Sequence, residues 1–196
     1  MLRVASSTQR SNHLRYAVLL LTLGIALSSS GYALTEEGDV AWQHRVERNG
    51  IALMASALGR HSREAFYEAR GFSAAMIRPY ALACGFSVGV QNAGNAVITT
   101  RLIDWYAVGA DGAKVGIAQP EAWDADWDKS GVSQPARIAF RWAQFQSENT
   151  FEPGDWIMGM MTLETVPSAP FRLTVRYRAN HAEHEIVLDK LECARD

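Results

Sequence analysis

The amino-acid sequence predicts an α+β protein in which two to three helices precede an antiparallel β-sandwich of about seven strands. Before residue 84, apolar residues recur at the three- and four-residue intervals of an amphipathic helix. After residue 85, apolar and polar residues alternate at a period of two, which is typical of strands with one buried face. Glycine, proline and asparagine separate the alternating stretches, as expected of turns between short strands.

Residues 1–33 have the three-part pattern of a secretory signal peptide. Three arginines are the only charged residues of this stretch, an uncharged apolar run follows over residues 16–27, and small residues end at Ala33. An apolar run of about 12 residues is shorter than the roughly 20 needed to span a bilayer. We therefore expect cleavage, no membrane span afterwards, and a periplasmic or secreted protein, with an uncleaved signal anchor as the alternative.

Removal of the first 33 of the 196 residues leaves 163, a length suited to one structural domain over residues 34–196. Within it, we assign residues 34–84 to the helical region and residues 85–196 to the β-sandwich. The mature chain keeps 16 of the 19 basic residues and all 21 acidic ones, a net charge near −5. A protein of this charge has no general attraction for nucleic acid, so we expect no nucleic-acid partner.

Two cysteines, Cys84 and Cys193, lie in the part of the chain that is expected to be exported. An even number of cysteines in an oxidising compartment favours a disulfide. The bond would span 109 positions and tie the start of the β region to its last strand. No CxxC pair accompanies either cysteine, so a structural role is favoured over a catalytic one.

The helical region is expected to contain three helices. The first covers residues 35–59, which Asn49-Gly50 interrupts, and the other two cover residues 62–71 and 74–83. The apolar face of the first helix is expected to be formed by Trp42, Val46, Leu53 and Ala57.

The seven strands are expected over residues 86–91, 97–108, 115–118, 137–143, 156–163, 171–178 and 184–193. The alternation is clearest in FRLTVRYR, residues 171–178, where every second residue is apolar. The stretch 156–163 is apolar on both faces, which is typical of a strand that is covered on both sides. Residues 119–135 form the one extended irregular segment of this region.

The strongest candidate for a ligand-binding site is this irregular segment, and within it residues 121–131. Its candidate ligand-binding residues are Trp123, Asp124, Asp126, Trp127 and Asp128. Exposed tryptophan rings can stack on sugar rings while nearby carboxylates bind hydroxyl groups. The alternative is that the two tryptophans are buried anchors that hold the segment against the sheet.

The Asp-x-Asp-x-Asp spacing also resembles the first three ligands of an EF-hand calcium loop. The sixth position is Lys129 rather than glycine, and the twelfth is Pro135 rather than a bidentate glutamate. His181 and His184 form a second polar cluster, but two histidines in a hairpin turn supply at most two of the ligands that zinc needs. We therefore expect solvated polar segments at both places, and we assign no metal and no cofactor.

A row of arginines is the candidate surface for a protein partner. Its residues are Arg141, Arg172, Arg176 and Arg178, which alternate with apolar residues in two of the expected strands. If these strands are neighbours, the guanidinium groups form a basic face for an acidic partner or for lipid headgroups. The alternative is an ordinary polar sheet face, cross-paired with acids such as Glu183 and Glu185.

The sequence contains no HExxH and no glycine-rich phosphate loop or dinucleotide fingerprint. It contains no GxSxG nucleophile elbow either, because its one GxSxG match, residues 85–89, lies in the alternating pattern of an expected strand. We therefore expect a non-catalytic protein-binding module of the cell envelope, either an accessory factor or an immunity-type protein. The alternative is a carbohydrate- or calcium-dependent binding module that uses residues 121–131, and a hydrolase is the third interpretation.

Overall fold

The computed structural model describes residues 41–195, so the signal peptide expected over residues 1–33 lies outside the described residues. The described chain opens with a β-hairpin of β1 (His44–Arg48) and β2 (Ile51–Ala57). Asn49 and Gly50 connect the strands with φ of 53° and 77°, the two positive values of a type I′ turn. The first expected helix is therefore wrong over residues 44–57, and Asn49-Gly50 forms the turn of a hairpin.

The second and third expected helices are confirmed as α1 (Arg60–Glu68) and α2 (Ala74–Leu82). The hydroxyl oxygen of Ser73 accepts a hydrogen bond from the Met76 amide at 3.3 Å and caps the start of α2. Pro79 lies inside α2, as expected. The mixed α+β class is confirmed, with four helices and a large antiparallel sheet.

The sheet has ten strands rather than seven. After β2, these are β3 (Gly85–Asn92), β4 (Ile98–Arg101), β5 (Tyr106–Val108), β6 (Lys114–Ala118), β7 (Glu148–Phe151), β8 (Trp156–Leu163), β9 (Phe171–Ala179) and β10 (Ala182–Leu191). A 3₁₀ turn at Leu102–Asp104 divides the expected strand 97–108 into β4 and β5. The strand order is β1-β2-β3-β8-β6-β5-β9-β4-β7, and β10 pairs with the other edge of β9.

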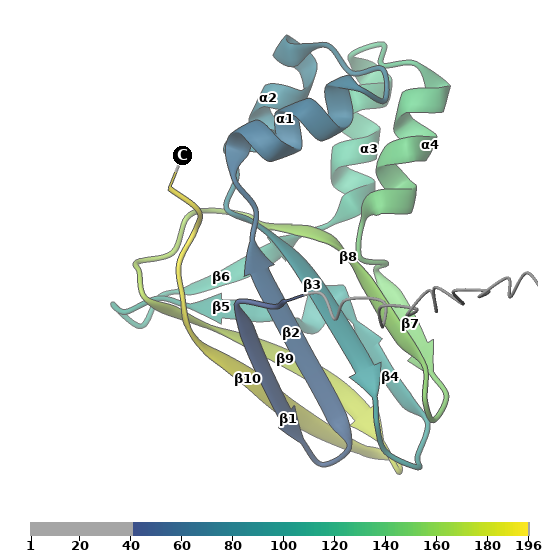
Figure 1. Ribbon diagram of the computed structural model, residues 1–196, viewed down its shortest axis with the longest axis vertical. Helices are drawn as coiled ribbons and strands as arrows, with labels where there is room; N and C mark the ends of the chain where they lie inside the picture. The colour runs from purple at the N-terminus through teal and green to yellow at the C-terminus, as the bar shows by residue number, and fades with distance from the viewer. Residues whose placement is uncertain (1–40, 196) are drawn as a thin grey trace, which may run out of the picture. The chain divides into compact units, whose positions relative to one another are not determined.

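The sheet folds over on itself, so that β1, β2 and β3 lie over β9 and β10 (Figure 1). One side chain in two from each strand points between these layers and joins the main hydrophobic core. Leu53, Val88 and Met161 come from one layer, and Val175 and Ile186 come from the other.

Two segments that were expected to be irregular or extended are helices, α3 (Pro120–Lys129) and α4 (Gln134–Ala143). Each has a proline in its first turn, where the missing N–H costs no helical hydrogen bond. The expected strand over residues 137–143 is therefore wrong. Phe140 and Ala136 are buried on one side of α4, whereas Trp142 is 82% exposed.

The four helices gather at one end of the β layers and form a helical cap with its own hydrophobic core (Figure 1). Tyr80 lies at the centre, with ring centroids 5.3 Å from Phe140 and 5.4 Å from Tyr67. Its hydroxyl donates to Gln144 Oε1 at 3.1 Å, and Gln144 Nε2 donates to the Tyr67 hydroxyl at 2.6 Å. Burial raises the pKa of both tyrosines, so this network is neutral.

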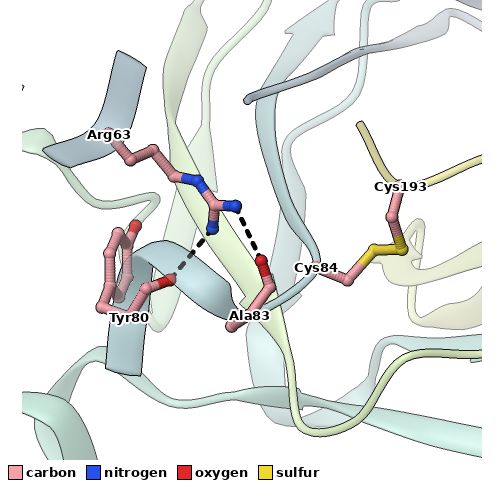
Figure 2. The surroundings of a disulfide bond; sticks show 5 residues. All are labelled: Arg63, Tyr80, Ala83, Cys84 and Cys193. Carbon is pink, nitrogen blue, oxygen red and sulfur yellow. Dashed lines mark hydrogen bonds between the residues drawn. A yellow bond between two sulfur atoms is a disulfide. The ribbon is translucent and has the colours of Figure 1, made fainter. Parts of the chain in front are cut away.

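The disulfide expected between Cys84 and Cys193 is confirmed, with the two Cα atoms 5.3 Å apart (Figure 2). Beside it, the buried guanidinium of Arg63 closes the C-terminal end of α2. Its Nη1 donates to the Tyr80 carbonyl at 3.0 Å, and its Nη2 donates to the Ala83 carbonyl at 2.7 Å. The cation thus satisfies carbonyl groups that the end of a helix leaves without an intrahelical partner.

Among the described residues, no helix is both long enough and apolar enough to cross a membrane.

Candidate functional surfaces

The two tryptophans of the predicted ligand site anchor α3 in the helical cap, Trp127 fully buried and Trp123 half-buried. Trp127 is 4% exposed and its indole donates to the Met76 carbonyl at 3.3 Å. Trp123 stacks on Trp127 with ring centroids 5.8 Å apart and donates to the Thr162 hydroxyl at 3.1 Å. Their spacing of four residues places both rings on the face of α3 that points into the core of the helical cap. They therefore act as anchors that hold the segment, as one of the two interpretations expected, and they do not form an exposed platform for sugar stacking.

The three aspartates of the predicted site do not converge either. Asp124 accepts from Arg137 at 2.8 and 2.9 Å and from Arg141 at 3.0 Å, and Asp128 also binds Arg137. Asp126 contacts neither arginine and pairs instead with Lys129 at 3.2 Å. Hydrogen bonds from Arg137 hold the pKa of the Asp124 carboxyl below its usual range.

The calcium-loop interpretation therefore fails, because alternate aspartates lie on different sides of a helix. The described residues contain no group of three or more histidine, cysteine, aspartate or glutamate side chains placed to hold a metal ion. His181 lies in the turn between β9 and β10, and His184 stacks on Tyr177 with ring centroids 5.2 Å apart.

A groove of about 790 Å³ runs beside α3 and α4, lined by these helices and by residues 144–148. Asp124, Asp128 and the two arginines that they bind are among its lining residues, so these opposite charges are paired with each other. The lining also includes Ser147, whose hydroxyl lies 2.6 and 2.8 Å from the two carboxylate oxygens of Glu121. The sequence analysis missed this groove because it placed the α4 residues in a strand.

The structure brings together three of the four arginines of the predicted partner-binding face. Arg172, Arg176 and Arg178 lie on the outer face of β9, whereas Arg141 lies on α4 in the helical cap. Arg176 pairs with Glu185 of β10 at 2.8 Å. The predicted row that includes Arg141 is therefore wrong, and the part on β9 includes a cross-strand ion pair of the kind proposed as the alternative.

The outer face of the opposite layer carries an apolar surface that the sequence analysis did not predict. Antiparallel register places Met158 of β8 beside Gly89 of β3, which lies beside Met54 of β2. The Trp42 ring and the end of the Met54 side chain both lie over Gly89, where this residue has no Cβ atom. Two residues before Met158, Trp156 points to the same side of β8. We call the surface formed by Trp42, Trp156 and Met158, with the buried Met54 beneath it, the Trp–Met face.

Two of these side chains project from the surface. Trp156 is 58% exposed and Met158 is 48% exposed. β3 pairs with this half of β8, whereas β6 pairs only with Thr162 and Leu163 at the other end of the strand. The next outward side chain of β8, Met160, packs against the helical cap. β8 was predicted to be covered on both sides, and this is correct only for the half that lies under the helices.

No protein-family model, curated protein or solved structure matches this chain. Its function must therefore be inferred from these surfaces.

Proposed function

We propose that this protein is exported and acts as a non-catalytic module that binds another protein of the cell envelope through the Trp–Met face. The observation that carries the proposal is the exposure of Trp156 and Met158 side by side on one face of β8. Contiguous apolar surface is uncommon on proteins that act alone, and tryptophan and methionine are enriched where proteins meet.

The charges around the face define the chemistry of the partner. Asp155 directly precedes Trp156, and Glu152 lies three residues before Asp155 in the same turn between β7 and β8. On the far side of the layer, Arg45 and Glu47 of β1 pair with each other at 3.4 Å and balance in charge. The rim is therefore acidic beside the exposed tryptophan. We infer that the partner presents apolar side chains together with lysine or arginine.

Two kinds of envelope protein fit this chemistry, an accessory factor of a larger assembly and an immunity-type protein that blocks a delivered toxin. Export is supported by the signal-peptide pattern of residues 1–33 and is compatible with the disulfide between Cys84 and Cys193.

A photo-crosslinking amino acid at Met158, introduced in the organism that makes the protein, tests the proposal. We expect one dominant cross-linked protein, identified by mass spectrometry. The matched control carries the same group at Arg172, on the outer face of β9, and should not capture this protein. Equal capture at both positions, or no capture at Met158, would contradict the proposal.

The isolated partner then allows a quantitative test. Trp156→Ala should weaken binding by about 2 kcal/mol, roughly 30-fold in Kd, because a central tryptophan usually dominates such an interface. Arg172→Ala should leave Kd within about twofold of the wild-type value. A Trp156→Ala protein that folds normally and binds as tightly as the wild type would exclude the Trp–Met face as the docking site.

A further inference from the structure

A small pocket lies at the end of the β layers away from the helical cap. Three turns meet there, namely those between β1 and β2, between β3 and β4, and between β9 and β10 (Figure 1). The pocket has a volume of about 160 Å³. Four asparagines and two stacked rings supply its polar and flat surfaces: Asn49, Asn92, Asn95, Asn180, Tyr177 and His184.

The backbone around the pocket is held in place by contacts between the turns. A Cβ atom on Gly50 would lie 2.7 Å from the Cα atom of Gly94, so the first two turns pack backbone against backbone. The buried side chain of Asn92 donates to the carbonyls of Ala96 and Phe151 at 2.8 and 3.0 Å, and it accepts from the Gly94 amide at 3.1 Å. The pocket is therefore formed before any ligand arrives, which lowers the entropic cost of binding.

The polar groups that remain available in this pocket are neutral. Its lining contains no lysine, arginine, aspartate or glutamate. The side chains of Asn95 and Asn180 make no hydrogen bond to another described residue, so each offers an amide N–H₂ donor and a carbonyl acceptor. The ring of His184 stacks on Tyr177 and forms a flat, half-buried wall.

We propose that this pocket binds a neutral sugar unit. Each hydroxyl group of a sugar donates one hydrogen bond and accepts others, which matches the two functions of an asparagine amide. The flat wall of His184 suits the apolar face of a sugar ring. The volume corresponds to about five water molecules, which fits one sugar unit rather than a longer chain. Arg48 precedes Asn49 and acts electrostatically on Tyr177, but it is not a lining residue, so the lining offers a phosphorylated or carboxylated sugar no lysine or arginine.

The lining of this pocket shares no residue with the Trp–Met face or with the acidic helix α3, so the proposed protein-binding function and the sugar site can fail independently. The turns that form the pocket are distant in sequence, and no single stretch of the chain carries the pattern.

The test titrates the purified protein with neutral monosaccharides, namely glucose, galactose, mannose and N-acetylglucosamine, and follows backbone amide signals by NMR. We expect saturable shifts in the three turns for at least one sugar, and no such shifts with glucose 6-phosphate or glucuronate. Absence of saturable shifts with all four neutral sugars, or equal shifts with the two anionic ones, would overturn the proposal.

Two variants locate the binding. Asn180 has a φ of 51°, so Asn180→Gly removes the amide at a position where glycine adopts the same backbone conformation. Asn95→Asp keeps the shape of the side chain and removes its donor. Each should raise the Kd of the sugar about tenfold while the protein remains folded. Arg172→Ala, on the outer face of β9, is the matched control and should leave sugar binding unchanged. Unchanged binding in both asparagine variants would place the sugar elsewhere.

Discussion

Gly159 of β8 is the position at which the structure predicts the largest effect of adding a single methyl group. A Cβ atom there would lie 2.3 Å from the Phe145 amide nitrogen and 2.5 Å from the Gln144 carbonyl carbon. Real Cβ atoms essentially never approach a neighbour closer than 3.0 Å, so the two backbones must separate by roughly 0.7 Å. The contacting atoms belong to the main chain and cannot rotate away.

The movement has a definite cost. The Phe145 amide donates to the Met160 carbonyl at 2.8 Å, and the Phe145 ring, fully buried, lies 5.0 Å from the ring of Trp105. Overpacking of a core destabilises a fold by about 1–3 kcal/mol, and a weakened hydrogen bond by about 1 kcal/mol. Alanine also restricts the unfolded chain more than glycine does, which stabilises the folded state by about 0.5 kcal/mol. We therefore expect Gly159→Ala to lower the free energy of unfolding by about 2–3 kcal/mol, a fall in Tm of roughly 4–12 °C.

Urea unfolding of the oxidised protein, followed by tryptophan fluorescence, measures this difference. Gly116→Ala is the matched control, because a Cβ atom there meets only the carboxylate of Glu164, an exposed side chain that can move aside. We expect the control to remain within about 1 kcal/mol of the wild type. If the two variants are equally stable, the close approach of residues 144–145 to β8 does not make residue 159 intolerant of a Cβ atom, and the reasoning is wrong.

Three further perturbations test other parts of the fold. The double variant Cys84→Ser/Cys193→Ser opens a loop of 109 positions and should lose about 4–5 kcal/mol of stability, read from its urea midpoint against the oxidised wild type. Arg63→Met leaves two carbonyl groups at the end of α2 without their donors and should lower the free energy of unfolding by about 2–4 kcal/mol. A decrease below about 1 kcal/mol in the same assay would show that the guanidinium is dispensable. Arg137 holds the pKa of Asp124 below its usual range. The ionised carboxylate therefore stabilises the fold above about pH 4, and this stabilisation disappears as the pH falls through the lowered pKa. Asp124→Asn should therefore be less stable by about 1–3 kcal/mol at neutral pH and should approach the wild type in acid, and a difference that is independent of pH would contradict this.

Local patterns predicted those elements whose periodicity had only one interpretation. The strict alternation of residues 171–178 gave β9, and the capping serine before residue 74 marked the start of α2. The disulfide followed from an even number of cysteines in a chain expected to be exported. The first two signals lie in a few neighbouring residues and the third is a count of cysteines, so none of them required knowledge of tertiary packing.

Errors arose where one short stretch satisfied two periods. In the β1–β2 hairpin, Val46 and Leu53 fit a helical face, yet Ile51, Leu53 and Ala55 also alternate and are all buried. In α4, alternation suggested a strand, but Phe140 is buried and Trp142 is exposed, so alternate residues do not share a face. Tertiary packing decides between the two periods, and the sequence alone does not contain that contact information.

The Trp–Met face could not be predicted for a different reason. The even-numbered apolar residues of β8 look alike in sequence, but the helical cap covers Met160 and leaves Met158 and Trp156 uncovered. Whether an apolar side chain belongs to the core or to a docking surface depends on where a separate group of helices ends. The small pocket lined by four asparagines likewise exists only because three turns that are distant in sequence meet in the fold.

Both helical hairpins of the cap begin and end at neighbouring points of the sheet. The chain leaves β2 at Ala57 and returns to β3 at Gly85, where the Leu58 amide donates to the Gly85 carbonyl at 2.9 Å. The second hairpin leaves β6 at Ala118 and returns at Gln144, and both residues pair along β8. A short linker could bridge either opening without altering the register of the strands. The cap is thus a module that can vary in length or be replaced while the strands beneath it keep their pairing.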